Sequence, residues 1–238
     1  MAAYVRLEVR RALRDTGFVF LGIGMPVVMY LLFTNLGTSD PDWKTASMVA
    51  MAAYGALGAA LSTGAGVAED KDSGWLRQLR VTPMTPRQVV TGRALTGSVV
   101  ILPAIAAVLG AGALVNGVRL DPWRWAAVAL ALWLGALPFT LLGMGNGYRL
   151  TAQTTGLVNV ACNLTLSIVG GLWFPAALFP HWLRTVSGFT PTQRFAEIGQ
   201  SLAAGTAPGP AAAGVIVGWA LLFGAYAVFS YRRSARTV

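Results

Sequence analysis

Residues able to support acid–base, metal or phosphate chemistry are few in this sequence and lie far apart. The single histidine, His181, is not part of an H-E-x-x-H motif, and neither Lys44 nor Lys71 follows a glycine as the lysine of a phosphate-binding loop does. No pair of carboxylates falls within an apolar stretch. We therefore expect no catalytic centre, no metal site and no nucleotide site in this chain.

Hydrogen-bonding side chains are instead concentrated in one apolar stretch. Their four-residue period places on one helical face Thr155, Asn159, Asn163 and Ser167. In lipid these groups need partners, either across a helix interface or on a cavity that holds a ligand. The interface is the favoured interpretation. Met51 and Tyr54 are candidate neighbours of such a cavity, although bulky residues more often serve packing.

The elements that must position these residues are apolar and long. Six windows contain no Asp, Glu, Lys, Arg or His, and they span 16–39, 45–68, 94–118, 125–148, 150–180 and 198–231. Each exceeds the 20 or so residues that a helix needs to cross a bilayer, where only helices and closed barrels satisfy the backbone. The chain is 55% hydrophobic and 11% charged, with a mean hydropathy of +0.59.

We therefore predict one all-α integral membrane domain over 1–238. It has six transmembrane helices, at 17–37, 46–68, 95–117, 126–147, 155–173 and 211–231. Within them we expect Pro26, Pro103 and Pro138 to kink helices, and the run 143–147, Gly-Met-Gly-Asn-Gly, to loosen the end of the fourth.

Basic residues give the predicted orientation. With both termini in the cytoplasm, 13 of the 18 Lys and Arg residues lie inside and 5 outside. This bias follows the positive-inside rule and accounts for the net charge of +9 without a nucleic-acid surface. The predicted location is therefore the cytoplasmic membrane.

Residues 1–16 precede the first span and have amphipathic spacing. Val5, Val9, Ala12 and Leu13 share one arc, while arginines occupy the other. Two interpretations are open: an interfacial helix on anionic headgroups, or a solvated start to the first span. The continuous apolar stripe favours the interfacial helix.

The interval 69–93 contains a second short helix. Asp72 or Ser73 can cap it, and Pro83 ends it. Its apolar arc consists of Trp75, Leu76 and Leu79. Spacing alone leaves two alternatives about even: insertion into a groove on another protein, or contact with lipid headgroups.

After the fifth span, two prolines and several aromatic residues follow at short intervals. Pro175 and Pro180 interrupt helix, and rings at interfacial depth come from Trp173, Phe174, Phe179 and Trp182. These residues by themselves favour an ordinary span end with an aromatic belt over a re-entrant segment.

Two of these intervals resemble ABC-2 type transporter permeases. Acidic residues, Gly74, a Leu-x-x-Leu-like pair, the Thr82-Pro83 step and Gly92-Arg93 are similar to the intracellular coupling loop of that family. The stretch 170–183, Gly-Gly-Leu-Trp-Phe-Pro-Ala-Ala-Leu-Phe-Pro-His-Trp-Leu, resembles its Gly-x-x-Phe-Pro…Pro-x-Trp-Leu signature, and a further proline follows at Pro191. With the N-terminal helix and the six-span order, the resemblance covers essentially the full length.

The resemblance implies three sets of site residues. ATPase coupling is expected at Gly74, Trp75, Leu76, Leu79, Arg80 and Pro83. An outer re-entrant gate over 174–197 is expected to use Gly171, Phe174, Pro175, Phe179, Pro180 and Trp182. A cavity or dimer interface near the axis is expected to include Met51, Tyr54, Asn159, Asn163 and Ser167.

It also implies partners and a function. A second permease copy, in a homodimer rather than a heterodimer, would join two ABC-type ATPase subunits that bind ATP and Mg, while this chain binds no cofactor. The complex would export a hydrophobic or amphiphilic drug, natural product or lipid-like substrate, as in drug efflux and drug resistance. An ion-coupled secondary transporter, which would need ionisable residues within its spans, is the alternative. A non-transporting assembly or immunity protein is another.

Overall fold

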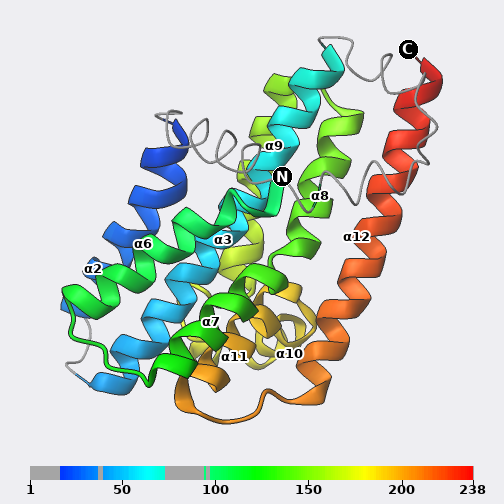
Figure 1. Ribbon diagram of the computed structural model, residues 1–238. Coiled ribbons are helices and arrows are strands. Elements are labelled where there is room, and N and C mark those ends of the chain that lie inside the picture. Colours follow the sequence, from blue (N-terminus) through cyan, green and yellow to red (C-terminus); the bar gives the residue numbers. More distant parts are fainter. Residues whose placement is uncertain (1–16, 37–39, 73–93, 95–96, 238) are drawn as a thin grey trace.

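The computed structural model describes residues 17–36, 40–72, 94 and 97–237. Helices make up 86% of it, and no strand occurs within those ranges, so the predicted all-α class is confirmed there. Long helices form one bundle, and two shorter ones, α10 and α11, lie across its lower end in Figure 1. The predicted interfacial helix over 1–16 and nearly all of the coupling segment, 73–93, fall outside the described residues.

Among the described residues, three helical stretches are long and apolar enough to cross a membrane. They are α3 (Pro41–Asp72), the consecutive pair α7 (Pro122–Gly135) and α8 (Leu137–Arg149), and α12 (Pro210–Thr237). These correspond to the second, fourth and sixth predicted spans. The others contain the π-helix η1 (Phe18–Gly24) with α2 (Met25–Leu36), then α6 (Ile101–Leu114), and α9 (Ala152–Val169). The six-span count stays a prediction.

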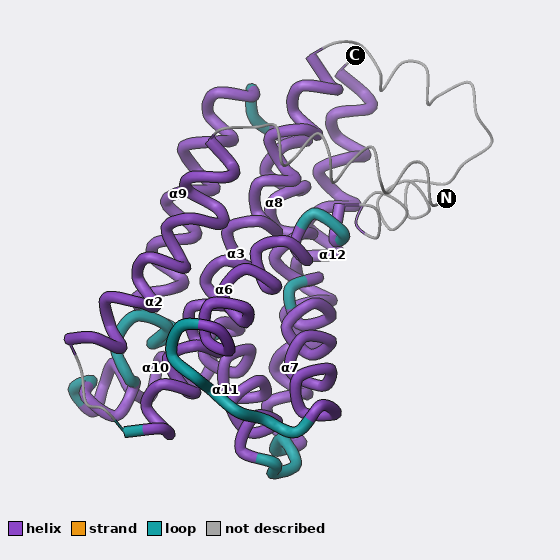
Figure 2. The backbone as a smooth tube through the Cα atoms, turned by 60° about the vertical axis from the view of Figure 1, so that its left-hand side comes forward, coloured by secondary structure: helices purple, strands orange, loops and turns teal. Residues whose placement is uncertain are grey.

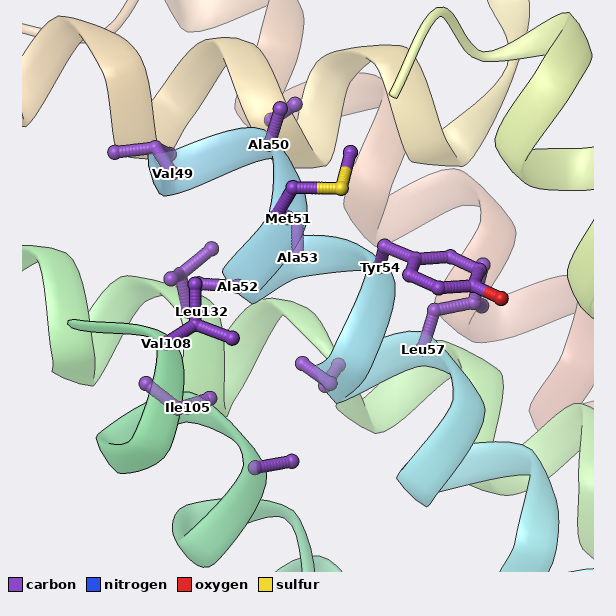
Figure 3. Close-up of a cluster of buried hydrophobic side chains, with 14 of the residues drawn as sticks. Val49, Ala50, Met51, Ala52, Ala53, Tyr54, Leu57, Ile105, Val108 and Leu132 are labelled. Atoms are coloured by element: carbon purple, nitrogen blue, oxygen red, sulfur yellow. The ribbon is translucent and has the colours of Figure 1, made fainter. Parts of the chain in front are cut away.

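Helix α3 is the centre of the bundle. It contacts α2, α6, α8, α9 and α11, and its middle is buried on every side. Figure 3 shows Ile105 and Val108 of α6 and Leu132 of α7 facing it. Alanine and glycine supply much of its surface, so neighbouring helices approach it closely from several directions.

The closest approach joins α3 to α8. A Cβ atom on Gly64 would lie 2.1 Å from the Gly143 carbonyl oxygen, and one on Gly147 would lie 2.2 Å from the Gly64 carbonyl oxygen. Gly145 faces α12, where a Cβ atom would meet the Tyr226 ring at 2.4 Å. The glycine run that we expected to loosen this helix therefore has another role. It lets α8 fit between two neighbours.

Irregular points in the helices lie near three prolines. Helix α7 ends at Gly135, and Ala136 separates it from α8, in which Pro138 is the second residue. Proline lacks a backbone N–H, and its ring clashes with the preceding turn. The regular series of helical hydrogen bonds is therefore interrupted at Ala136. Pro26 is likewise the second residue of α2, which begins where the π-helix ends. Pro103 lies in the first turn of α6, and a turn at Val99 and Val100 separates that helix from the helical residues 97 and 98.

Two helices close the lower end of the bundle between α9 and α12. They are α10 (His181–Phe189) and α11 (Pro191–Ala204), preceded by the 3-10 turn η2 (Ala176–Leu178). The Phe195 ring of α11 packs against Phe139 of α8 at 5.6 Å between centroids. Figure 2 shows α10 and α11 at the end opposite the C-terminus. This is the predicted re-entrant region, although its depth in a membrane stays a prediction.

The glycine contact predicts a steep difference between two alanine substitutions in α3. Gly64→Ala forces the backbones of α3 and α8 apart, and overpacking of this kind costs about 1–3 kcal/mol. Gly66→Ala is the matched control, because its Cβ atom meets nothing within 4 Å and alanine favours helix. Thermal unfolding of the purified protein in one detergent should show a lower midpoint only for Gly64→Ala. Equal midpoints would contradict the contact.

Candidate functional site

A chain of buried amides connects four helices near the glycine contact. The Tyr226 hydroxyl donates to Asn146 Oδ1 at 3.0 Å, and Asn146 Nδ2 donates to Asn159 Oδ1 at 2.8 Å. Asn159 Nδ2 in turn donates to the Leu61 carbonyl at 2.8 Å. These bonds link α12, α8, α9 and α3 in that order. Because both asparagines are nearly inaccessible to solvent, each bond satisfies groups that lipid could not.

The rest of the predicted polar stripe also faces inward. Thr155 donates to the Thr151 carbonyl, and Ser167 contacts the Asn163 side chain at 3.4 Å. Asn163 lies against Gly58 of α3. The stripe thus meets α3 within the same chain, while Leu157, Val160, Leu164 and Ile168 form the exposed side of α9. A role for the stripe in cargo binding or dimer contact stays a prediction.

A cavity of about 380 Å³ lies at the other end of α3. Its lining comes from four parts of the chain. They are Phe33 of α2, then Trp43, Ala46, Ser47, Ala50 and Met51 of α3, residues 170–173, 175 and 176 after α9, and Gln193, Ala196, Glu197 and Gln200 of α11.

Aromatic residues build the apolar part of this cavity. Phe33, Trp43 and Trp173 line it, and Tyr54 packs edge-on against Trp173 at 5.6 Å between centroids. The structure therefore places Met51 on the cavity and Tyr54 directly behind it. Figure 3 shows both side chains projecting from α3 on the same side.

Polar groups in the cavity wall differ in whether they have partners. Trp43 Nε1 donates to the Phe33 carbonyl at 3.3 Å, Gln200 Nε2 donates to the Ala46 carbonyl at 3.4 Å, and Glu197 pairs with Arg194 at 2.7 Å. In contrast, two solvent-shielded atoms, Trp173 Nε1 and Gln193 Oε1, have no hydrogen bond to any described residue.

The predicted gate residues divide into two groups. Gly171 has a φ of +73°, which turns the chain sharply after α9, and it lines the cavity together with Pro175. Phe174 packs edge-on against Phe33 but is half exposed. Phe179, Pro180 and Trp182 lead into α10 and do not line the cavity. The structure thus brings only part of this set to one site.

All six predicted coupling residues lie outside the described residues, but the structure describes the end of α3, which precedes them in the chain. Lys71, in the last turn of α3, donates hydrogen bonds to the carbonyls of Gly147 and Leu150. A cation at the end of α8 suits the unpaired carbonyls and negative dipole found there. The segment that follows Asp72 therefore departs from a fixed corner between α3 and α8.

Sequence reasoning missed several residues of these sites. Asn146 sits between two glycines in a predicted span, and one amide there could have indicated a partner for the α9 stripe. Tyr226, Gln193 and Lys71 gave no comparable signal, because each needs a partner more than 70 residues away or a cavity built from several elements. No cluster of potential metal ligands occurs among the described residues.

Comparisons with known proteins identify a family and a relative of this chain. A model of the ABC-2 type transporter family matches residues 2–202. The chain is also similar to a Bacillus subtilis (strain 168) protein named "Putative transport permease YvfS", with 27% identity over 206 residues that cover 84% of each chain.

The amide chain predicts that Asn159 stabilises a single copy of the protein. Asn159→Ala leaves Asn146 Nδ2 without its acceptor and removes the side-chain hydrogen bond to the Leu61 carbonyl, at a cost of about 1–3 kcal/mol. Asn163→Ala, on the same helical face, is the milder control. We expect a lower unfolding midpoint for Asn159→Ala that does not vary with protein concentration. A midpoint that rises with concentration would instead indicate an intermolecular contact.

Proposed function

This chain belongs to the ABC-2 type transporter family, and we propose that it is the permease subunit of an ATP-driven exporter. Its substrate would be hydrophobic or amphiphilic and would leave across the cytoplasmic membrane. The observation that most directly supports this proposal is the family match over residues 2–202. Members of this family are non-catalytic transmembrane components that associate with ABC-type ATPases.

The proposed assembly contains two copies of this chain and two ATPase subunits. The sequence has no G-x-x-x-x-G-K-[ST] motif, so ATP and Mg would be held by the partner. Trp75, Leu76 and Leu79 would dock on that partner. Lys71 would then transmit the movement, because it holds the start of the coupling segment against α8.

The cavity at the other end of α3 supports a transport role. A site of about 380 Å³ with aromatic walls and a few polar groups suits a small amphiphile. In the proposed orientation it lies at the outer end. Efflux and drug resistance would follow if the cargo is toxic. Transport into vesicles with and without ATP and the partner separates this proposal from an ion-coupled transporter and from a non-transporting assembly or immunity protein.

Charge supports the proposed orientation. The C-terminal ends of α3, α8 and α12 lie at one end of the bundle in Figure 1, and they carry Lys71, Arg149 and Arg232. Placing this end in the cytoplasm follows the positive-inside rule. Both termini would then be cytoplasmic.

Orientation can be tested by cysteine labelling in sealed cells. In a Cys162→Ala background, an impermeant thiol reagent should label Thr38→Cys and Thr206→Cys but not Ser73→Cys. Permeabilised cells, in which Ser73→Cys should become reactive, provide the control. Labelling of Ser73→Cys from outside intact cells would overturn the orientation.

Coupling is tested with the ATPase partner. Trp75→Ala and Leu79→Asp should each lower ATPase recruitment and stimulated hydrolysis by at least tenfold, since one buried aromatic contributes a few kcal/mol at a small interface. Arg77→Gln, on the opposite side of the predicted helix, should keep both. Membrane insertion should be unchanged in all three. Normal recruitment and transport by the Trp75→Ala, Leu79→Asp double variant would exclude this contact.

A further inference from the structure

The cavity beside Trp43 and Trp173 has features that select among ligands. Two residues that line it carry side-chain atoms of opposite hydrogen-bonding character: Trp173 Nε1 can only donate, and Gln193 Oε1 can only accept. Both are shielded from solvent, and neither has a partner in the described part of the chain. Buried polar atoms in native proteins almost always have partners, because leaving one unpaired costs about 1–3 kcal/mol.

The two residues are held near each other by the fold. Thr192 Oγ1 donates to the Leu166 carbonyl at 2.7 Å, which fixes the first turn of α11 against the end of α9. Gly170 leaves room for this contact, since a Cβ atom there would overlap the Thr192 side chain. Gln193, in the first turn of α11, and Trp173, in the turn after α9, therefore line the same cavity.

Neighbouring polar groups do not supply the missing partners. Trp43 and Gln200 donate to backbone carbonyls, and Glu197 is paired with Arg194. Among the residues that line the cavity, Glu197 carries the charge, and neither Lys nor Arg is present. An anionic head group would thus meet a carboxylate without a cation in the wall.

We infer that this cavity binds an uncharged amphiphile whose hydroxyl or amide group accepts a hydrogen bond from the Trp173 indole and donates one to the Gln193 side chain. Hydroxyl and secondary amide groups can do both, whereas a carboxylate only accepts and an ammonium only donates. The apolar body packs on Phe33, Trp43 and Met51. The inference rests on the proposed function in treating this ligand as cargo near the outer mouth.

Four probes with one body and different heads test the inference. They are 4-phenylbutan-1-ol, butylbenzene, 4-phenylbutylammonium and 4-phenylbutanoate. Binding is measured by ligand-observed NMR with the chain in neutral lipid nanodiscs, after subtraction of partitioning into empty nanodiscs. We expect the alcohol to bind at least threefold more tightly than each of the other three. Equal or tighter binding of the carboxylate or the ammonium would overturn the inference.

Three variants locate the binding. Trp173→Phe and Gln193→Met keep the apolar surface but each removes one hydrogen-bonding group. Each variant should therefore weaken binding of the alcohol about three- to tenfold and leave binding of butylbenzene unchanged. Ala46→Phe fills the cavity and should abolish binding of both. Equal weakening of alcohol and butylbenzene by the first two variants would reveal a merely structural role. Unchanged alcohol binding by Ala46→Phe would place the ligand elsewhere.

The experiment needs no ATPase, so it is independent of the coupling test. If the alcohol does not bind, the proposed ligand class is wrong, but the assignment of the chain as a permease is unaffected. Failure of the chain to recruit or stimulate an ATPase would remove the exporter assignment while leaving the measured binding site intact.

Discussion

The backbones of α3 and α8 touch with no side chains between them, at Gly64, Gly143 and Gly147. Dispersion forces between closely fitted surfaces are the main attraction available to helices in lipid, where apolar burial gives no advantage over the acyl chains. A single added methyl group in this contact displaces one helix from the other. The positions of α9 and α12 depend on it as well, because both pack against α8 or α3 along the same length.

The amide chain from Tyr226 to Leu61 strengthens the same region by different means. Glycine contacts set distance, whereas hydrogen bonds set rotation, since an amide has to face its partner. Together they define one register for four helices. At the opposite end of α3, several aromatic side chains take part in the packing, and the cavity lies there.

Much of the architecture was predictable from uncharged windows and their flanking charges, because length and apolarity determine whether a helix can cross a bilayer. The polar face of α9 was equally visible from its four-residue period. Its partners were not, because Asn146 and Leu61 are identified only once α8 and α3 are packed. The glycine run at 143–147 was misinterpreted for the same reason: glycine signals both flexibility and close approach, and the neighbouring helix decides between them. The cavity required the turn at Gly171 and the placement of α11, neither of which periodicity specifies.

Helix α3 is continuous from Pro41 to Asp72 and passes the glycine contact well away from its midpoint. At 1.5 Å per residue, Lys71 lies about 10 Å from Gly64 on one side, and Ser47 lies about 25 Å from it on the other. A rigid rod pivoting at Gly64 has unequal arms. A small tilt imposed at Lys71 would therefore move the wall of the cavity about two and a half times as far, in the opposite direction. If α3 tilts as a rigid rod, the glycine contact is its fulcrum, and the end that lines the cavity moves farther than the end that carries Lys71.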